Sequence, residues 1–529
     1  MDLSEQVGQL LVALPTDAMP LARFVEEAPV GGFLLPNETR GSARVVARAI
    51  AAAQERALAR SGQPLFIAAD QEGGDMSFFR GEVTEIPSNM AIAATGDATA
   101  AREAALIVAN DLRAIGINWD FAPVVDVNTD AGNPVIGVRS YGDDPAVVAA
   151  FAAEAVAGYQ ARGILACAKH FPGHGDTHLD SHVAMPVVAH DRERLDGVEL
   201  VPFRAVIAAG VASVMSAHLL APALDPSRPA TLSAPILTDL LRGELGFDGL
   251  TVTDAMPMGA ISRAWDEGEA AIAAINAGAD VVLGGRGLAR HRRVHRALLA
   301  AVRDGRIPRA RFVDALARVA RAKARIATSE SGGRVGTAGD RARALALARR
   351  SITIVRDDPQ ILPLARDLGD RLVVLSPAGS RATKMELWHA RPSALGAEIA
   401  DRVRGAVDIP ISYPLSRSER AAVTRAARRA EVIVVGTLNA AIDPSQLTLV
   451  RRLCEETKAR VVVVALRGPY DVLRMPWAPT VVCAYSSAAP SLRAVAEVLT
   501  GEQLARGALP VALPLPRHVA APQARRTSA

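Results

Sequence analysis

Short apolar runs alternate with longer helical stretches through the first part of the chain, and this alternation limits the possible folds more than any other feature. Ala-rich stretches of helical pattern separate the runs, such as AVVAAFAAEAVAGYQ at 146–160. Such strand–helix units cover both faces of a parallel sheet. The runs lie at 30–35, 64–69, 117–124, 164–169, 212–217, 249–253 and 280–285. These seven units favour a (β/α)8 TIM-type barrel over an open sheet, although the sequence identifies no eighth strand.

The second part of the chain repeats the alternation on a smaller scale. A stretch rich in Gly, Ser and Thr comes first, and strand-like runs follow at 351–355, 371–376, 407–412, 431–437, 460–466 and 480–486. We therefore predict an α/β protein of two domains. The predicted parts are a TIM-type barrel at 1–327, a linker at 328–344, a smaller α/β sandwich domain at 345–515 and a disordered tail at 516–529.

The composition argues against several classes of protein. The 60 Lys and Arg residues are nearly matched by 56 Asp and Glu, and no basic stripe with interleaved aromatics occurs, so we expect no nucleic-acid partner. The three cysteines lie far apart and predict no disulfide framework. No uncharged apolar run approaches the length of a membrane span, and the N-terminus lacks a signal-peptide pattern. We expect a cytoplasmic protein with no membrane partner, monomeric or weakly homo-oligomeric.

Charged and imidazole groups follow five successive runs of the predicted barrel. They are Asp70 after the second run, Asp126 after the third, Lys169 and His170 at the end of the fourth, His218 after the fifth and Asp254 after the sixth. Parallel barrels build their sites at the C-terminal ends of the strands, from the loops that follow. One such residue would carry little weight, but groups after five runs predict one shared pocket.

The densest group of titratable residues is KHFPGHGDTHLDSH at 169–182, which holds four of the ten histidines. Their spacing of four residues would align the imidazoles on one face of a helix and so invites a metal site. Pro172, Gly173 and Gly175 disfavour that helix. A metal site built from the loop, and with it a metal-dependent hydrolase, stays as an alternative. We expect no metal and no cofactor.

The end of this loop is suited to proton transfer. In an extended or turn segment, residues two apart point the same way, so Asp180 can accept a hydrogen bond from His182. That bond fixes the tautomer and raises the basicity of the other ring nitrogen, as in the Asp–His part of a serine-hydrolase triad. The alternative is a structural role, in which both side chains stabilise the loop by hydrogen bonds to its backbone.

No G-x-S-x-G motif supplies a serine nucleophile for such a dyad. The best nucleophile is Asp254, which ends an apolar run and is followed by Met256, Pro257 and Met258, an apolar and poorly hydrated wall. A carboxylate and a proton donor flanking one bond are the arrangement for retaining glycoside hydrolysis. The alternative for Asp254 is a helix N-cap.

The motif at 169–182 resembles the signature of the family 3 glycoside hydrolases, in their β-N-acetylglucosaminidase branch. Other long motifs extend the resemblance over nearly the whole chain: LSEQVGQLLV (3–12), VGGFLLPN (30–37), FIAADQEGG (66–74), FAPVVDVNTDAGNPVIGVRSYGDDP (121–145), ALDPSRPATLSAPILTDLLRGELGFDGLTVTDAM (223–256) and AYSSAAPSLRAVAEVLTGEQLARGALPVALP (484–514). The resemblance implies a (β/α)8 barrel followed by an α/β sandwich, in agreement with the strand pattern. It also implies an exo-acting, retaining hydrolase of terminal β-linked N-acetylglucosamine, with a glycoside or oligosaccharide substrate and a place in peptidoglycan turnover.

Residue by residue, the resemblance implies specific roles. Asp254 matches the catalytic nucleophile, and His182 matches the acid/base with Asp180 as its partner. The residues that match or adjoin sugar-binding positions are Asp70, Arg139, Lys169, His170 and, in the apolar wall, Met258. A carboxylate can accept two adjacent hydroxyls, while Arg and Lys can donate to hydroxyls or to an acetamido carbonyl.

One segment departs from the family pattern, which usually continues DQEGG with arginines. Here the sequence reads DQEGGDMSFFRG, with Asp75 in the first position, Phe78 and Phe79 close by and only Arg80 basic. If these positions contact the leaving group, the added carboxylate and the aromatic rings disfavour an acidic muramyl-type partner. They favour a neutral glycan or an aromatic aglycone.

Two other functions stay open. A histidine acid/base lacks the negative charge that would repel phosphate, so a β-N-acetylglucosaminide phosphorylase on the same scaffold fits the dyad as well. The other is a non-catalytic sugar-binding protein, against which the full set of Asp180, His182 and Asp254 argues.

Overall fold

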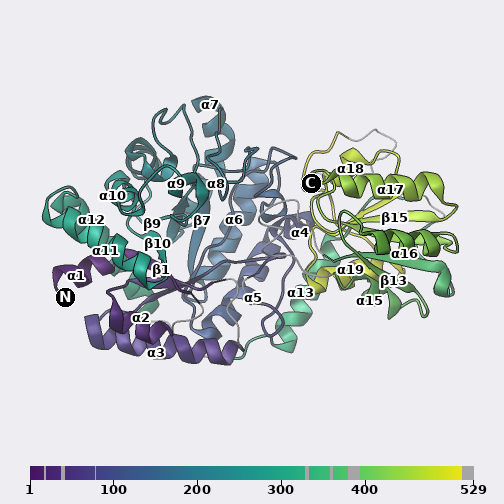
Figure 1. The fold of residues 1–529 in the computed structure, drawn as a ribbon, viewed down its shortest axis with the longest axis horizontal. Coiled ribbons are helices and arrows are strands. Elements are labelled where there is room, and N and C mark those ends of the chain that lie inside the picture. Colours follow the sequence, from purple (N-terminus) through teal and green to yellow (C-terminus); the bar gives the residue numbers. More distant parts are fainter. Residues whose placement is uncertain are drawn as a thin grey trace, which may run out of the picture.

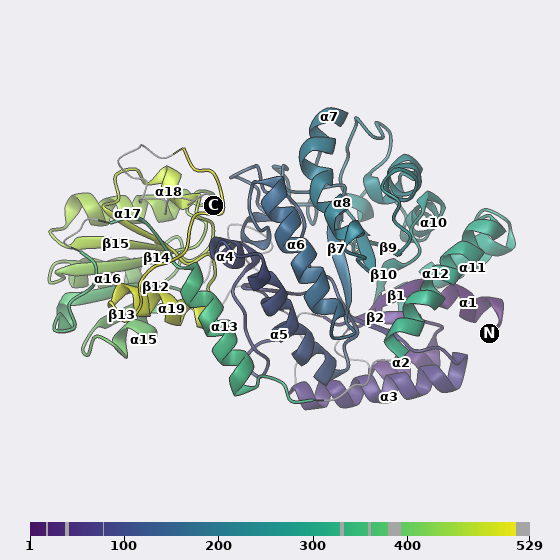
Figure 2. The same ribbon diagram turned by 180° about the vertical axis from the view of Figure 1, so that it is seen from behind.

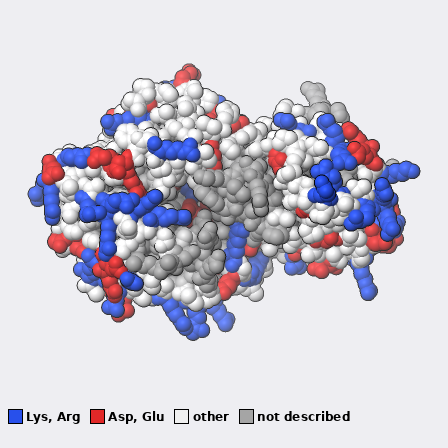
Figure 3. Space-filling model, viewed as in Figure 1, with Lys and Arg blue, Asp and Glu red and all other residues white. Residues whose placement is uncertain are grey.

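The computed structural model describes residues 1–16, 20–36, 42–77, 79–327, 333–357, 361–378 and 393–514. The chain forms two lobes side by side (Figure 1). The N-terminal lobe, purple to teal, holds the barrel, and the C-terminal lobe, green to yellow, holds a second sheet. Lys and Arg side chains are interspersed with Asp and Glu over the face shown in Figure 3.

Eight parallel strands form a nearly closed barrel in the order β10-β1-β2-β3-β6-β7-β8-β9. Their bounds are β1 Leu11–Leu14, β2 Gly32–Leu34, β3 Phe66–Ala69, β6 Trp119–Asp120, β7 Leu165–Phe171, β8 Ser213–Ser216, β9 Leu250–Thr253 and β10 Val282–Arg286. A single bridge between Val252 and Val281 joins the two ends of the sheet. The strands are almost entirely buried, as expected for a parallel sheet covered on its outer face by helices.

The strand that the sequence did not identify is β1. It pairs with β10 on one side and β2 on the other, so it closes most of the barrel. It has only four residues and comes directly after helix α1, Leu3–Gly8. In sequence, only Gln9 and Leu10 separate α1 from β1, and a run this short gives no period of its own.

Helices surround the barrel, and Figure 2 shows α3, α5 and α6 on one side of it. Helices α5 and α6 approach closely because Gly158 lies at their contact, where a Cβ would come 2.6 Å from the carbonyl oxygen of Arg102. The remaining barrel elements include a short hairpin and two π-helical segments. Bounds are α2 Leu21–Glu27, α3 Ala43–Ser61, β4 Gln71–Gly73, β5 Met76–Ser77, α4 Asn89–Ala94, α5 Thr99–Ile115, α6 Pro145–Gln160, α7 Arg192–Arg194, π-helical Leu195–Glu199, α8 Leu200–Ala208, π-helical Pro235–Glu244, α9 Gly259–Ser262, α10 Glu267–Ala277, α11 Leu288–Arg303 and α12 Arg309–Ala327.

The C-terminal lobe contains a six-stranded mixed sheet in the order β11-β16-β15-β14-β12-β13, in which β11 alone runs antiparallel to its neighbour. Strand bounds are β11 Thr353–Arg356, β12 Leu372–Pro377, β13 Val407–Ile411, β14 Val432–Thr437, β15 Arg460–Ala465 and β16 Thr480–Cys483. Helix bounds are α13 Ala338–Ser351, α15 Leu395–Ala400, α16 Arg417–Ala427, α17 Pro444–Glu456, α18 Asp471–Arg474 and α19 Ala489–Leu499. The predicted fold class, a barrel followed by a smaller α/β domain, is confirmed.

The predicted domain limits stay predictions. Helix α13 begins at Ala338, inside the stretch 328–344 that the sequence predicted as a linker. Residues 328–332 of that stretch and the predicted tail at 516–529 lie outside the described residues. Within the described ranges, no helix is both long and apolar enough to cross a membrane.

The two lobes share a packed interface on the side of α4 that faces the C-terminal lobe. Met90, Ala91 and Ala94 of α4 belong to the hydrophobic core of the C-terminal lobe. Beside them, the Ser88 hydroxyl donates to the carbonyl oxygen of Tyr485 over 2.6 Å. The contact between the lobes therefore combines apolar packing with a hydrogen bond. It lies close to the C-terminal ends of the barrel strands.

Candidate active site

A cleft of about 490 Å³ opens at the C-terminal ends of the barrel strands. Apolar side chains such as Leu35, Met215 and Pro257 form part of its wall. All but one of the eight predicted site residues line it: Asp70, Arg139, Lys169, His170, His182, Asp254 and Met258. The eighth, Asp180, contacts His182 from outside this lining. The structure therefore brings the predicted residues together in one place, as parallel barrels do with strand-end residues.

Asp254 follows β9 at the bottom of this cleft. Its Oδ1 accepts a 2.7 Å hydrogen bond from the backbone N–H of Ala255. Burial by itself would raise the pKa of this carboxyl, but the nearby imidazoles of His218, His170 and His182 outweigh burial and hold the pKa below its usual value. Asp254 does not cap a helix, because α9 begins at Gly259. The carboxylate is therefore ionised and available to react.

His182 and Asp180 form the predicted pair. Asp180 Oδ1 accepts from His182 Nδ1 at 2.7 Å and from the His182 backbone N–H at 2.8 Å. Burial would raise the pKa of Asp180, but the hydrogen bonds and charge of His182 outweigh it and lower the pKa. The backbone N–H of Gly259 donates to the His182 carbonyl at 3.2 Å, and that of Ala260 donates to the Ser181 carbonyl at 3.1 Å. The start of α9 thus holds the pair against the segment that follows Asp254.

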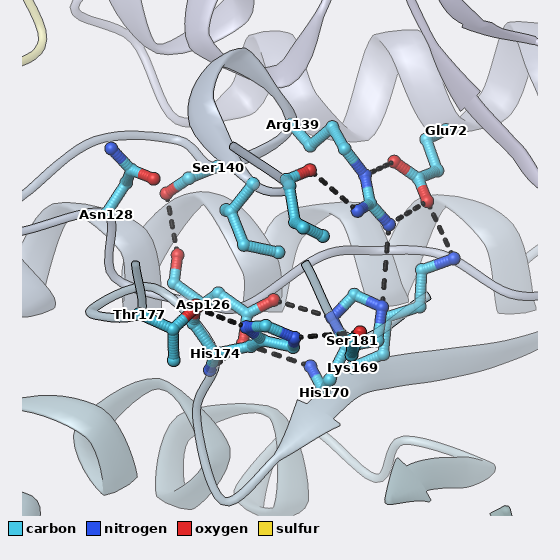
Figure 4. Close-up of polar contacts among 12 residues, drawn as sticks. Glu72, Asp126, Asn128, Arg139, Ser140, Lys169, His170, His174, Thr177 and Ser181 are labelled. Carbon is cyan, nitrogen blue, oxygen red and sulfur yellow. Dashed lines mark hydrogen bonds and ion pairs between the residues drawn. The ribbon is translucent and has the colours of Figure 1, made fainter. Parts of the chain in front are cut away.

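Glu72, on β4, joins Arg139 and Lys169, two cations of the cleft lining (Figure 4). Its carboxylate accepts two hydrogen bonds of 2.8 Å from Arg139 and lies 2.7 Å from Lys169 Nζ. Burial alone would raise the pKa of Glu72, but the charges of Arg139 and Lys169 outweigh burial and lower it far below the usual range. Lys169 Nζ also donates to Asp70 over 2.8 Å. Two cations are thereby fixed at the wall of the cleft, beside the more exposed Asp70.

Asp126 fixes the neighbouring imidazole. Its Oδ2 lies 2.7 Å from His170 Nδ1, and its Oδ1 accepts from the backbone N–H groups of His170 and His174. His170 Nε2 then lies 3.5 Å from Nη2 of Arg139, a group that can only donate a hydrogen bond. Sequence reasoning placed Asp126 near the pocket without a role and did not single out Glu72. Glu72 lies two residues after Asp70, and Asp126 lies in the same motif as Arg139, so both occur in segments from which another site residue was predicted.

Comparison with known proteins agrees with this geometry. The glycosyl hydrolase family 3 N terminal domain matches residues 2–322, and the C-terminal domain of the same family matches residues 352–526. The chain belongs to glycosyl hydrolase family 3. Two curated relatives are a beta-hexosaminidase A of Pseudoalteromonas piscicida, 30% identical over 95% of this chain and 92% of the relative, and a beta-N-acetylglucosaminidase/beta-glucosidase of Cellulomonas fimi, 31% identical over 96% and 93%.

A similar solved structure covers almost the same length. The family 3 beta-N-acetylglucosaminidase from Paenibacillus sp. str. FPU-7 superposes with a TM-score of 0.91 at 38% identity, over 97% of this chain and 99% of that one. This protein is therefore a two-domain glycoside hydrolase of family 3, similar to β-hexosaminidases along its whole described length.

The four histidines of 169–182 hold separate partners in this family 3 hydrolase. His170 contacts Asp126, His182 contacts Asp180, and the exposed His178 lies 2.8 Å from Asp130. His174 lies 2.8 Å from the Thr177 hydroxyl and 3.1 Å from the Ser181 hydroxyl. The segment that follows β7 is not a helix, so the spacing of four residues does not align these imidazoles on one helix face.

Among the described residues, one other group has the composition of a metal site. Asp176, His190 and Glu199 place one ligand atom each within 4.8 Å of one another. Arg194 lies 3.2 Å from Glu199 and 3.7 Å from Asp176, so a guanidinium already supplies the positive charge between these carboxylates. We therefore interpret the group as an ion-pair cluster behind the catalytic loop.

The structure corrects the expectation for the departure at Asp75. Asp75 is 7% exposed and points to the C-terminal lobe, where Arg467 Nε donates to its Oδ2 at 2.8 Å and the Ser487 hydroxyl donates to its Oδ1. Phe79 is buried, and Phe78 lies outside the described residues. An ion-paired carboxylate repels an acidic leaving group less than a free one would, so Asp75 no longer supports the predicted bias against acidic partners, and the contribution of Phe78 stays a prediction.

Proposed function

We propose that this family 3 hydrolase is a retaining exo-β-N-acetylglucosaminidase that acts through a covalent glycosyl ester of Asp254. The observation that carries the proposal is the ionised Asp254 in the same cleft as His182, close enough for the imidazole to lower its pKa. Asp180 orients that imidazole through Nδ1. A nucleophilic carboxylate and an oriented acid/base in one cleft are the two components that retaining hydrolysis requires.

In the first step, a carboxylate oxygen of Asp254 attacks the anomeric carbon. The bond from that carbon to the leaving oxygen breaks, its electron pair stays on the oxygen, and Nε2 of protonated His182 gives the oxygen its proton. Asp180, already negative and hydrogen-bonded to Nδ1, stabilises the imidazolium before transfer and holds the ring in position afterwards.

In the second step, the neutral imidazole of His182 removes a proton from water. The water oxygen attacks the anomeric carbon on the face that the leaving group vacated, and the ester bond to Asp254 breaks with its electron pair returning to the carboxylate. Two inversions at one carbon give net retention of the β configuration.

Sugar recognition comes from Asp70, Arg139 and Lys169, which together form the sugar-binding wall of the cleft. Asp70 can accept hydroxyls, and Lys169 and Arg139 can donate to hydroxyls or to an acetamido oxygen. The names of the relatives and of the Paenibacillus structure support an N-acetylated sugar in this position. Met258 and Met215 add apolar surface against the ring face.

The direct test compares an aryl β-N-acetylglucosaminide with an aryl β-glucoside, while NMR follows the anomer first released. Faster cleavage of the acetamido substrate with β-N-acetylglucosamine as the initial product is expected. Initial release of the α anomer would remove the covalent mechanism, and preference for the glucoside would remove the sugar assignment.

A phosphorylase is the second candidate, favoured by the acid/base being an imidazole and not a carboxylate. After the glycosyl ester forms, phosphate meets a neutral His182 in place of a second anion. The same assay in phosphate buffer separates the two functions, because N-acetylglucosamine 1-phosphate forms only if phosphate replaces water. The cytoplasmic location, the monomeric or weakly oligomeric state and the place in peptidoglycan turnover stay predictions from the sequence.

A further inference from the structure

The hairpin of β4 and β5 connects the cleft to the C-terminal lobe. It follows Asp70 directly, and its first strand carries Glu72, which fixes Arg139 and Lys169. Its turn carries Asp75, three residues further along the chain. Whatever holds Asp75 therefore also limits where Glu72 can lie.

The turn is held from several directions. The backbone N–H of Gly74 donates to the carbonyl of Ile86 at 2.9 Å, and Arg80 donates to the carbonyl of Asp75 at 2.5 Å. A Cβ on Gly74 would come 2.8 Å from the Cβ of Ser88, so the turn lies directly on the residue whose hydroxyl reaches the backbone of Tyr485. The turn has little room to move toward the barrel.

On its other side, the carboxylate of Asp75 receives two side chains from the C-terminal lobe. Arg467 follows β15 and Ser487 follows β16, so both come from the C-terminal ends of neighbouring parallel strands. Both residues are 9% exposed, and Asp75 is 7% exposed. A buried carboxylate next to a buried guanidinium is held in place strongly, because either charge without the other would be costly to bury.

This contact also adjoins the cleft itself. A smaller hollow of about 60 Å³ between the lobes is lined by Asp75, Met76, Arg467 and Arg139. Met76 and Arg139 line the catalytic cleft as well. Met76 and Arg139 therefore lie between the ion pair that joins the lobes and the sugar-binding wall.

We propose that the C-terminal lobe positions the sugar-binding wall, with Arg467 and Ser487 holding Asp75 so that Glu72 keeps Arg139 and Lys169 in place. Arg467 is a positioning residue that acts through the hairpin. The sugar-binding part of this inference rests on the proposed function, whereas the mechanical part, the holding of the hairpin, does not.

The test uses the full chain with Arg467→Gln, Asp75→Asn, the double variant and the conservative Arg467→Lys. Misplacing the sugar-binding groups by a fraction of an ångström is expected to lower kcat/KM by a factor on the order of 10 to 100 in each neutralising variant. The double variant should be no worse than the poorer single one, because both remove the same contact. Arg467→Lys keeps the charge and should recover part of the loss.

Arg350→Gln is the matched control. It breaks another ion pair between the lobes, the 2.7 Å pair of Arg350 and Asp97, whose side chains are 39% and 43% exposed and which does not involve the hairpin. Its kcat/KM should stay within about two-fold of the wild type. Wild-type kinetics in Arg467→Gln, or an equal loss in Arg350→Gln, would overturn the proposal.

Hydrogen exchange measured by mass spectrometry separates this proposal from the proposed function. Peptides covering residues 70–77 should exchange faster in Arg467→Gln and in the milder Ser487→Ala, but not in Arg350→Gln. If the wild type cleaves no N-acetylglucosaminide while the hairpin loosens as described, only the proposed function fails. If cleavage is normal and exchange of these peptides is unchanged in both variants, only the positioning role fails.

Discussion

Two histidine–aspartate pairs face the same cleft and differ mainly in how they are held. His170 with Asp126 and His182 with Asp180 both have a 2.7 Å separation between Nδ1 and the carboxylate. The side chain of Asp126 is fully buried and that of His170 is 7% exposed, whereas the side chains of Asp180 and His182 are 10% and 19% exposed. The same pairing of residue types therefore occurs once almost fully buried and once partly accessible to solvent.

The attachment of the two pairs explains the difference. His170 lies within strand β7, and Asp126 also holds the backbone of His174. Asp180 and His182 lie on a loop whose carbonyls accept two hydrogen bonds from the start of α9. A pair fixed to a strand can position a sugar, while a pair on a docked loop can approach and leave the reacting oxygen. Under the proposed mechanism, burial and attachment, and not the residue types, separate the binding pair from the proton-transfer pair.

Asp254→Ala removes the proposed nucleophile, which lines the same cleft as His170 and His182, and should have the largest effect. Turnover is expected to fall by a factor on the order of 10⁴, because the variant lacks the carboxylate that forms the glycosyl ester in the proposed mechanism. Steady-state kinetics with an aryl β-N-acetylglucosaminide measure it, and circular dichroism checks that the fold is intact. Near-normal turnover would remove Asp254 as the nucleophile.

Asp180→Asn acts only on the partly exposed pair, Asp180 and His182. Loss of the carboxylate removes the orientation of His182 and the stabilisation of its imidazolium, so kcat should fall by a factor on the order of 10². The loss should be larger for alkyl than for nitrophenyl leaving groups, since poor leaving groups need the proton most. An equal loss for both kinds of substrate would argue that Asp180 only supports the loop.

Asp126→Asn acts on the buried pair and should affect binding and stability more than proton transfer. Burial would raise the pKa of Asp126, but the charge of His170 and its hydrogen bonds outweigh burial and lower it. A folded-state pKa below the unfolded value of about 4 means that the stabilisation is present above pH 4 and is lost as the pH falls through the lower folded value.

The free energy of unfolding of Asp126→Asn should therefore be lower by about 3 kcal/mol at neutral pH and should depend less on pH in the acid range. Thermal unfolding followed from neutral pH to about pH 3 measures both effects, while KM should rise more than kcat falls. A variant with wild-type acid sensitivity would show that Asp126 is not the group responsible.

Gly259→Ala tests how the loop that carries Asp180 and His182 is held, without removing a titratable group. A Cβ at this position would come 2.7 Å from the carbonyl oxygen of His182 and 2.8 Å from that of Val183. The loop must shift outward, and kcat should fall by about ten-fold with little change in KM. Gly197→Ala is the control, because a Cβ there meets nothing within 4 Å.

His178→Ala should have the smallest effect. His178 lies on the same loop, but its side chain is 82% exposed and pairs with Asp130. It does not belong to the residues that line the cleft. We expect stability to change by less than about 0.5 kcal/mol and turnover to stay at the wild-type value. A strong loss of turnover would mean that the loop contributes more than the one pair.

Much of this site was predictable from residues that are near one another in sequence. Asp180 and His182 are two positions apart, and Asp254 ends a recognisable apolar run, so local pattern was enough to select them. The pattern missed β1, which is too short to show a period next to α1. It also missed Glu72, because its partners Arg139 and Lys169 are distant in the chain and only folding reveals the contact.

The sequence by itself determined the fold class, the family and the strand-end positions that meet in the cleft, because these depend on local periodicity and on motifs. Only the tertiary structure decided which imidazole meets which carboxylate and which pair is buried. It also decided that Asp75, 392 residues away from Arg467 in the chain, is neutralised between the lobes. Electrostatics depends on distance and burial in space, and neither quantity can be read along a chain.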